Sequence, residues 1–159
     1  MARHQPTTPP QLALFDRLLQ GDNIETDRSA DSALRELRDS VRRDLEILFN
    51  TRPMHRPYAP WLSELQHSIV TFGLPSLQGQ HLGSFAQKEQ FRIYLENLIL
   101  RTETRFRELT VELIEQEGPL ERTLRLQIQA VLETDSISEV VVFDTTVDPI
   151  TGGFVVQER

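Results

Sequence analysis

Apolar residues along the chain recur first with the spacing of helices and later with the spacing of strands. The first run predicts a short amphipathic helix at about residues 12–20, because its apolar positions follow the i, i+3, i+4, i+7 pattern. These positions are Leu12, Leu14, Phe15, Leu18 and Leu19. Residues 22–31 are polar and show no periodicity, so we expect residues 1–31 to form a flexible arm that carries this helix. The helix either lies on the domain's own core or docks into a partner's groove, in which case Phe15 and Leu18 are the candidate contact residues.

A longer helix is predicted from Asp31 or Ser32, either of which can cap it, to about Asn50. Its apolar stripe consists of Leu34, Leu37, Val41, Leu45 and Leu48. The opposite face interleaves arginines with acids, so we interpret it as a solvated or protein-contacting face and not as a nucleic-acid site. The ion pairs expected one turn apart are Arg35–Asp39 and Asp39–Arg43.

Prolines and glycines punctuate the middle of the chain. The apolar segment Trp61–Phe72 predicts a short helix that ends at Gly73 and Pro75. Ser84–Gln87 reads as a capping box that opens a second long helix. The apolar stripe of this helix consists of Phe91, Tyr94, Leu95, Leu98 and Ile99. The pattern does not fix how far the helix continues past Arg101.

From Thr110 the apolar period changes to two, which is typical of strands. Short strands are predicted around residues 110–113 and 124–130, where apolar and polar residues alternate. Residues 140–143 are apolar on both faces, which indicates a central strand, and residues 154–156 supply the last one. The turn signals between them are Gly118-Pro119, Asp148-Pro149 and Gly152-Gly153. Helices followed by an antiparallel meander predict an α+β fold, with the helices packed on a small sheet formed by the carboxyl-terminal half, as one domain over residues 32–159.

The composition narrows the possible partners and compartments. The chain has 159 residues, of which 38% are apolar and 26% charged, values typical of a soluble globular protein. A net charge of −7 argues against binding nucleic acid or anionic lipid. No run approaches the roughly 20 apolar residues of a membrane span, so membrane insertion is not expected. Residues 1–10 lack the apolar run of a signal peptide and the chain has no cysteine, so the expected compartment is the cytoplasm.

The sequence predicts no catalytic, cofactor-binding or metal-binding site. The Glu64-x-x-His67 pair resembles half of a di-iron carboxylate site, but the second copy and its partner glutamates are missing. No Gly-rich phosphate loop or Gly-x-Ser-x-Gly elbow occurs. Glycoside hydrolysis needs two carboxylates, one of them in an apolar pocket, and the acids Glu46, Glu96 and Glu108 lie opposite apolar stripes.

Unlike charges crowd the sequence Glu103-Thr104-Arg105, at the expected junction of the second long helix with the first strand. One interpretation is a solvated helix end, where basic groups suit the helix dipole. The other is a charge pair that faces a protein partner, because arginine can bind a carboxylate through two parallel hydrogen bonds. In the second interpretation Glu103 and Arg105 are partner-binding residues.

Several short blocks in a fixed order give the chain a resemblance to a known family. They are Leu14–Leu18, Ser40–Glu46 with Leu48 and Asn50–Arg52, His67–Val70 with Phe72–Pro75, and Val141–Thr145 with Gly153-Phe154. The chain resembles the TssE subunits of type VI secretion baseplates, which are relatives of a phage baseplate wedge protein with a legacy lysozyme-like name. The family's best-known motif is Glu-Pro-Arg, which stands here as Glu103-Thr104-Arg105. Threonine in place of proline keeps its N–H and permits the helix to run on.

The resemblance implies a structural, non-enzymatic, cytoplasmic subunit without a cofactor. Such subunits contact the TssF and TssG wedge proteins through the charged motif, have TssK-type proteins as further baseplate partners, and template assembly of the contractile sheath. We predict that the last hairpin, Val140–Val156, supplies the sheath surface, because an exposed sheet edge accepts a partner strand. We also expect Arg105→Glu to weaken wedge binding without affecting folding. The alternatives are a subunit of a phage tail or related contractile particle and a cell-wall glycosidase, the latter suggested only by the legacy name.

Overall fold

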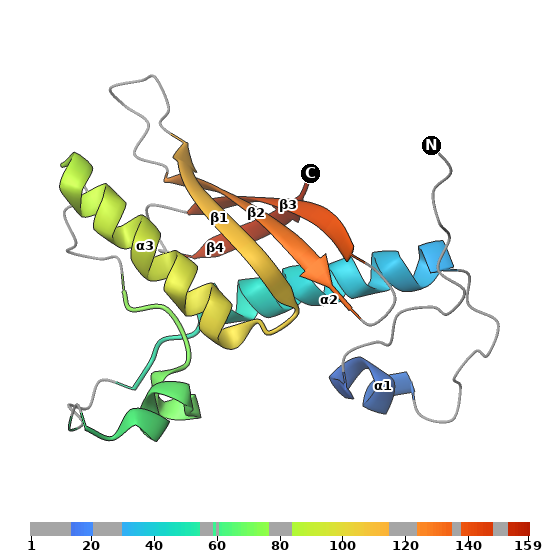
Figure 1. Cartoon of the computed structure of the whole chain (residues 1–159), viewed down its shortest axis with the longest axis horizontal. Coiled ribbons are helices and arrows are strands. Elements are labelled where there is room, and N and C mark those ends of the chain that lie inside the picture. Colours follow the sequence, from blue (N-terminus) through green and yellow to red (C-terminus); the bar gives the residue numbers. More distant parts are fainter. Residues whose placement is uncertain are drawn as a thin grey trace.

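The computed structural model describes residues 14–20, 30–54, 59, 61–76, 84–114, 124–134, 138–147 and 153–159. In chain order the elements are α1 (Leu14–Gln20), α2 (Ala30–Asn50), the 3₁₀ turns η1 (Ser63–His67) and η2 (Ile69–Thr71), α3 (Phe85–Thr102), β1 (Phe106–Ile114), β2 (Arg125–Glu133), β3 (Ser138–Val147) and β4 (Phe154–Glu158). The strands form one four-stranded antiparallel sheet in the order β1-β2-β3-β4. Helix α2 packs against β4 and α3 against β1 (Figure 1). The predicted α+β fold is confirmed, and β3 has a neighbour on each side, as predicted.

One hydrophobic core lies between the helices and one face of the sheet. In β2 the residues alternate between buried and more exposed, as the period of two predicted. In the predicted α2 stripe all positions are buried except Leu34, which is half-buried, and in the α3 stripe all are buried except Tyr94, which is 42% exposed. The largest fully buried side chains include Phe49, Phe143, Phe154, Leu95 and Ile99.

Two predicted local structures are wrong. Helix α2 begins at Ala30, so Asp31 and Ser32 lie in its first turn and do not cap it. The segment 61–72 forms two short 3₁₀ turns and not an α-helix. Ser68 lies between these turns with an extended backbone (φ −98°, ψ 165°), which prevents one continuous helix. The apolar pattern alone could not distinguish the two, since 3₁₀ turns also place residues three apart on one side.

Two predicted signals are confirmed. The Ser84 hydroxyl accepts from the Gln87 N–H at 3.3 Å, and the Gln87 side chain accepts from the Ser84 N–H at 3.2 Å, so the capping box forms. Gly73 follows η2 with a φ of +114°, a value that favours glycine. The turn signals at residues 118–119 and 148–152 lie outside the described residues.

The ion pairs on α2 differ from those that helical spacing predicts. In place of the Arg35–Asp39 and Asp39–Arg43 pairs, the Asp39 carboxylate lies 3.8 Å from Arg42 Nε. The Arg43 guanidinium donates to Asp16 of α1 at 2.6 Å. Asp16 is the better-shielded of these two carboxylates, and a shielded ion pair is screened less by water than an exposed one.

Side chains from the helices partly close both edges of the sheet. On β4, Asn50 Nδ2 donates to the Phe154 carbonyl and Asn50 Oδ1 accepts from the Phe154 N–H, both at 2.9 Å, so the amide takes the place of a neighbouring strand. On β1, the Val111 N–H donates to Glu96 Oε1 of α3 at 3.0 Å. Unpaired backbone groups on an edge strand can associate with strands of other chains. The Asn50 and Glu96 contacts reduce the number of such unpaired groups.

Asn50→Ala is expected to lower the free energy of unfolding by about 1–2 kcal/mol, because two backbone groups of the edge strand lose their partner. Urea unfolding measures the loss, and faster hydrogen exchange at Phe154 would locate it. The matched control is Asn97→Ala. Asn97 donates to the carbonyl of Ile93 one turn earlier, as Asn50 does to that of Glu46, but it makes no bond to a strand among the described residues. Equal losses for the two variants would contradict the prediction.

Candidate functional site

The charged motif predicted from sequence lies at the junction of α3 with β1. Helix α3 ends at Thr102, and Glu103 follows it with an extended backbone (φ −107°, ψ 93°) while its N–H still donates to the Ile99 carbonyl at 2.7 Å. The chain then turns through Thr104 and Arg105 into β1. A residue before proline favours the same extended region. The helix therefore stops where the family proline would stop it, although Thr104 stands in the proline's place.

Arg105 joins three elements through its guanidinium. It donates to both carboxylate oxygens of Glu103, from Nε at 2.6 Å and from a terminal nitrogen at 2.5 Å, which makes a bidentate pair. The same terminal nitrogen donates to Asp44 of α2 at 2.6 Å. The other terminal nitrogen lies 3.4 Å from the Ser40 hydroxyl. The network thus fixes the end of α3 and the start of β1 against the middle of α2.

This network is mostly shielded from water. The Glu103 side chain is 9% exposed, that of Arg105 20% and that of Asp44 42%. Burial by itself would lower the pKa of Arg105, but the hydrogen bonds and charges of Glu103 and then Asp44 outweigh it, so the pKa is raised and the guanidinium stays charged. The interpretation as a solvated helix end is therefore wrong for Glu103. Only Asp44 and part of Arg105 reach the surface.

Asp44 is a member of this network that no sequence pattern connects with the motif. Its carboxylate belongs to the polar face of α2, and the residue is 61 positions away from Arg105 along the chain. A capping or periodicity signal acts over a few residues, so no local signal could have joined them. The helix packing creates the contact.

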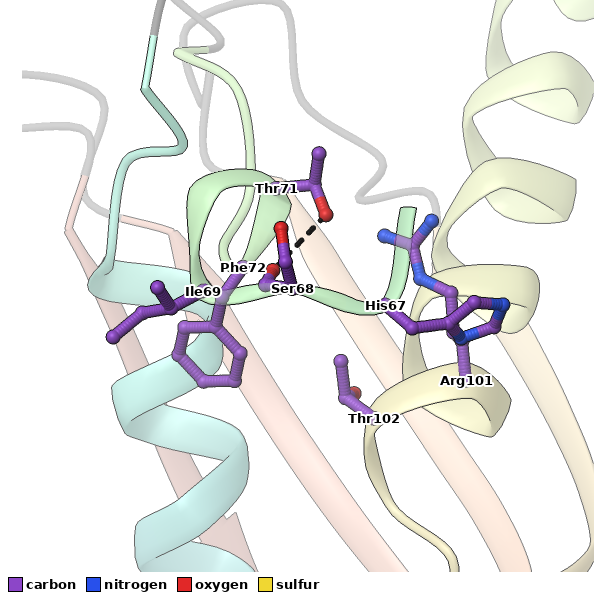
Figure 2. Close-up of a pocket in the computed structure, with 7 residues that line it drawn as sticks. All are labelled: His67, Ser68, Ile69, Thr71, Phe72, Arg101 and Thr102. Atoms are coloured by element: carbon purple, nitrogen blue, oxygen red, sulfur yellow. Dashed lines mark hydrogen bonds between the residues drawn. The ribbon is translucent and has the colours of Figure 1, made fainter. Parts of the chain in front are cut away.

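Two adjoining clefts lie beside the network. The first, of about 400 Å³, is lined by Asp44, Leu45, Ile47, Leu48, Phe72, Thr102, Glu103, Thr104 and Arg105. The second, of about 430 Å³, is lined by His67, Ser68, Ile69, Thr71, Phe72, Arg101 and Thr102 (Figure 2). They share Phe72 and Thr102, so a protein partner could contact both at once.

Helix α1 turns its acid toward the domain and its apolar side chains away from it. Asp16 is bonded to Arg43 of α2 and its side chain is only 15% exposed. The apolar side chains that are 63–71% exposed are Leu14, Phe15, Leu18 and Leu19. The alternative in which this helix lies on the domain's own core is therefore wrong. In Figure 1, α1 lies on the far side of α2 from the sheet.

Comparison with known families assigns this α+β domain to a class. Residues 35–136 match the family model described as Baseplate wedge protein gp25, and this range is more than half of the chain. The chain is therefore a structural, non-enzymatic component of a contractile tail or injection machine, which assembles with other baseplate and sheath proteins. It belongs to the baseplate wedge protein gp25 family, which includes the TssE subunits of type VI secretion systems.

The matched range begins within α2 and ends three residues after β2, so α1, β3 and β4 lie outside it. Comparison with curated proteins and with solved structures finds no match. In the described ranges no helix is long and apolar enough to cross a membrane. No group of three or more His, Asp or Glu side chains within those ranges is placed to hold a metal ion.

Proposed function

We propose that this chain is the TssE-type baseplate subunit of a type VI secretion machine, where it links wedge proteins of the TssF, TssG and TssK type and templates the contractile sheath. Family membership supports the baseplate role. The ordered sequence blocks that resemble TssE subunits support the type VI assignment, and with it a cytoplasmic location. In this proposal residues 1–31 are an arm that reaches a wedge partner, and residues 32–159 form the domain.

The proposal of wedge binding rests on the exposed apolar side of α1. Phe15 and Leu18 are three residues apart and therefore lie on one side of the helix. Both are more than 60% exposed, an unfavourable state for large apolar side chains that a partner's groove would relieve. Full burial of one such side chain contributes roughly 1.5–3 kcal/mol.

In the same proposal Glu103 and Arg105 have different tasks. Glu103 is buried and paired, so it holds the Arg105 guanidinium in one orientation. Arg105 and Asp44 present the accessible charges, beside the apolar cleft that contains the half-exposed Ile47. A wedge protein would dock a charged group here together with an apolar side chain.

The sheath surface is assigned to the last hairpin, Val140–Val156. Strand β4 is an edge of the sheet, which strand addition requires. Asn50 already holds both backbone groups of Phe154, so a sheath strand that pairs along all of β4 would have to displace this side chain. Displacing the side chain would cost the two Asn50 hydrogen bonds, which the hydrogen bonds of a paired sheath strand would have to replace.

Replacing both Phe15 and Leu18 with alanine is expected to weaken binding of a TssF–TssG wedge complex by about 100-fold or more, with the free energy of unfolding changed by less than about 0.5 kcal/mol. Calorimetry and urea unfolding of the full chain measure the two effects. The matched control replaces Ile93 and Leu100, two half-exposed residues of α3, with alanine and should leave binding intact.

The same assay separates the competing assignment. If the chain does not bind the TssF–TssG complex and instead binds wedge subunits of a phage tail or related particle, the type VI assignment is wrong. Unchanged binding by the double variant would show that α1 is not part of the interface. The identity of the neighbouring genes gives an independent check.

A further inference from the structure

Arg101 has no acidic partner among the described residues, whereas six other arginines do. Arg38, Arg42, Arg43, Arg92, Arg105 and Arg107 all form ion pairs. Arg101 lies in the last turn of α3, is half-buried, and makes no ion pair with any residue in the described part of the chain. Arg101 therefore offers a half-buried guanidinium without an ion-pair partner among the described residues, in a chain with a net charge of −7.

Among the described residues, the lining of the cleft that contains Arg101 has no acidic side chain. Its hydroxyl groups donate to backbone carbonyls of their own segments: Ser68 and Thr71 each to Leu65 at 2.8 Å, and Thr102 to Leu98 at 2.8 Å. Among the lining side chains, Arg101 and His67 are therefore the hydrogen-bond donors that have no partner within the described residues. Two such donors at one cleft suit an acceptor with two oxygens.

The remaining wall of the cleft is apolar. Ile69 is 89% exposed, and Phe72 is partly buried against the core. Figure 2 shows His67 and Arg101 on one side of the cleft, with Ile69 and Phe72 on the other. The cleft therefore combines a positive end with an apolar surface, within a space of about 430 Å³.

We infer that this cleft binds a carboxylate side chain of a neighbouring wedge protein, with an apolar side chain of the same segment seated against Ile69 and Phe72. Charge complementarity selects this occupant, because the free donors are cationic or neutral and none of the described residues that line the cleft is acidic. The inference rests on the proposed function for the identity of the neighbour. The cleft adjoins the Arg105 network through Phe72 and Thr102, so one partner segment can span both.

The test compares Arg101→Gln with Arg35→Gln in binding to the TssF–TssG complex by calorimetry. Arg35 is an exposed arginine of α2, so its variant makes the same charge change away from the cleft. Arg101→Gln is expected to weaken binding about 10- to 100-fold, the effect of losing a hydrogen bond to a charged group, with unfolding unchanged. Arg35→Gln should change binding less than about twofold. Equal binding by the two variants would overturn the inference and leave the proposed function standing.

A second measurement decides the inference if the wild-type chain does not bind the wedge complex, a result that would overturn the proposed function. The isotope-labelled full chain is titrated with the peptide acetyl-Leu-Glu-Leu-Leu-amide, and with the same peptide carrying glutamine in place of glutamate. Saturable shifts at the Arg101 Nε–H and the His67 ring with the glutamate peptide alone support the carboxylate site, provided that the His67 shifts are lost in Arg101→Gln. Equal shifts with both peptides, or none at these groups, overturn it.

Discussion

Gly73→Ala is expected to lower the free energy of unfolding by about 3 kcal/mol. The glycine has a φ of +114°, a backbone conformation that residues with a Cβ rarely adopt. A Cβ at this position would lie 2.4 Å from the Thr51 carbonyl oxygen and 2.8 Å from its carbon. That carbonyl is held in place, because it accepts a hydrogen bond from the Leu74 N–H at 2.9 Å. The backbone strain and the close contact with Thr51 therefore both destabilise the folded variant, and urea unfolding measures their combined effect.

The control for this prediction is Ser63→Ala, an exposed position in the same segment. It should change stability by less than about 0.5 kcal/mol, because it alters neither backbone strain nor packing. A Gly73→Ala variant as stable as the control would show that the loop relaxes at little cost. The Gly73 variant should also loosen the second cleft, since Ile69 of η2 and Phe72, which directly precedes the glycine, both line it.

Features that depend on neighbours in the sequence could be predicted well. The period of two in β2 and the capping box at Ser84–Gln87 act over a few residues, and both appear where the pattern placed them. Gly73 could be predicted as the end of its segment for the same reason. Its contact with Thr51 could not, because the two residues meet only after α2 and the following loop fold together.

The polar contacts that organise the site connect residues far apart in the sequence. Asn50 and Phe154 are 104 positions apart, and no periodicity or turn signal relates them. The position of Glu103 and Arg105 at the helix-to-strand junction followed from the sequence blocks around them. The burial of Glu103 and Arg105 could not be predicted in this way, because the charged motif has the same sequence features as a solvated helix end. Only the packing of α2 against it buries the pair. The ordered sequence blocks therefore locate the motif, and the packing of the helices determines how much of it is accessible to a partner.

Arg105→Met is expected to lower the free energy of unfolding by about 2–4 kcal/mol, because it leaves the Glu103 carboxylate buried and unpaired. The estimate is below that for a fully buried pair, since Arg105 and Asp44 are partly exposed. The matched control is Arg107→Met. The Arg107 side chain is 62% exposed and its guanidinium lies 3.3 Å from Glu133, so this variant should lose less than about 0.5 kcal/mol. Urea and thermal unfolding compare them, and equal losses would contradict the prediction.

This geometry changes the choice of variant for testing the motif in binding. Arg105→Glu would place a third carboxylate beside Glu103 and Asp44, so weaker wedge binding could result from unfolding alone. The double variant Glu103→Leu with Arg105→Met removes both charges and replaces the pair with apolar side chains, a change that is often neutral or stabilising. We expect it to recover most of the stability lost in Arg105→Met but not the wedge binding. Recovery of binding together with stability would mean that the pair serves only to hold α3 and β1 against α2.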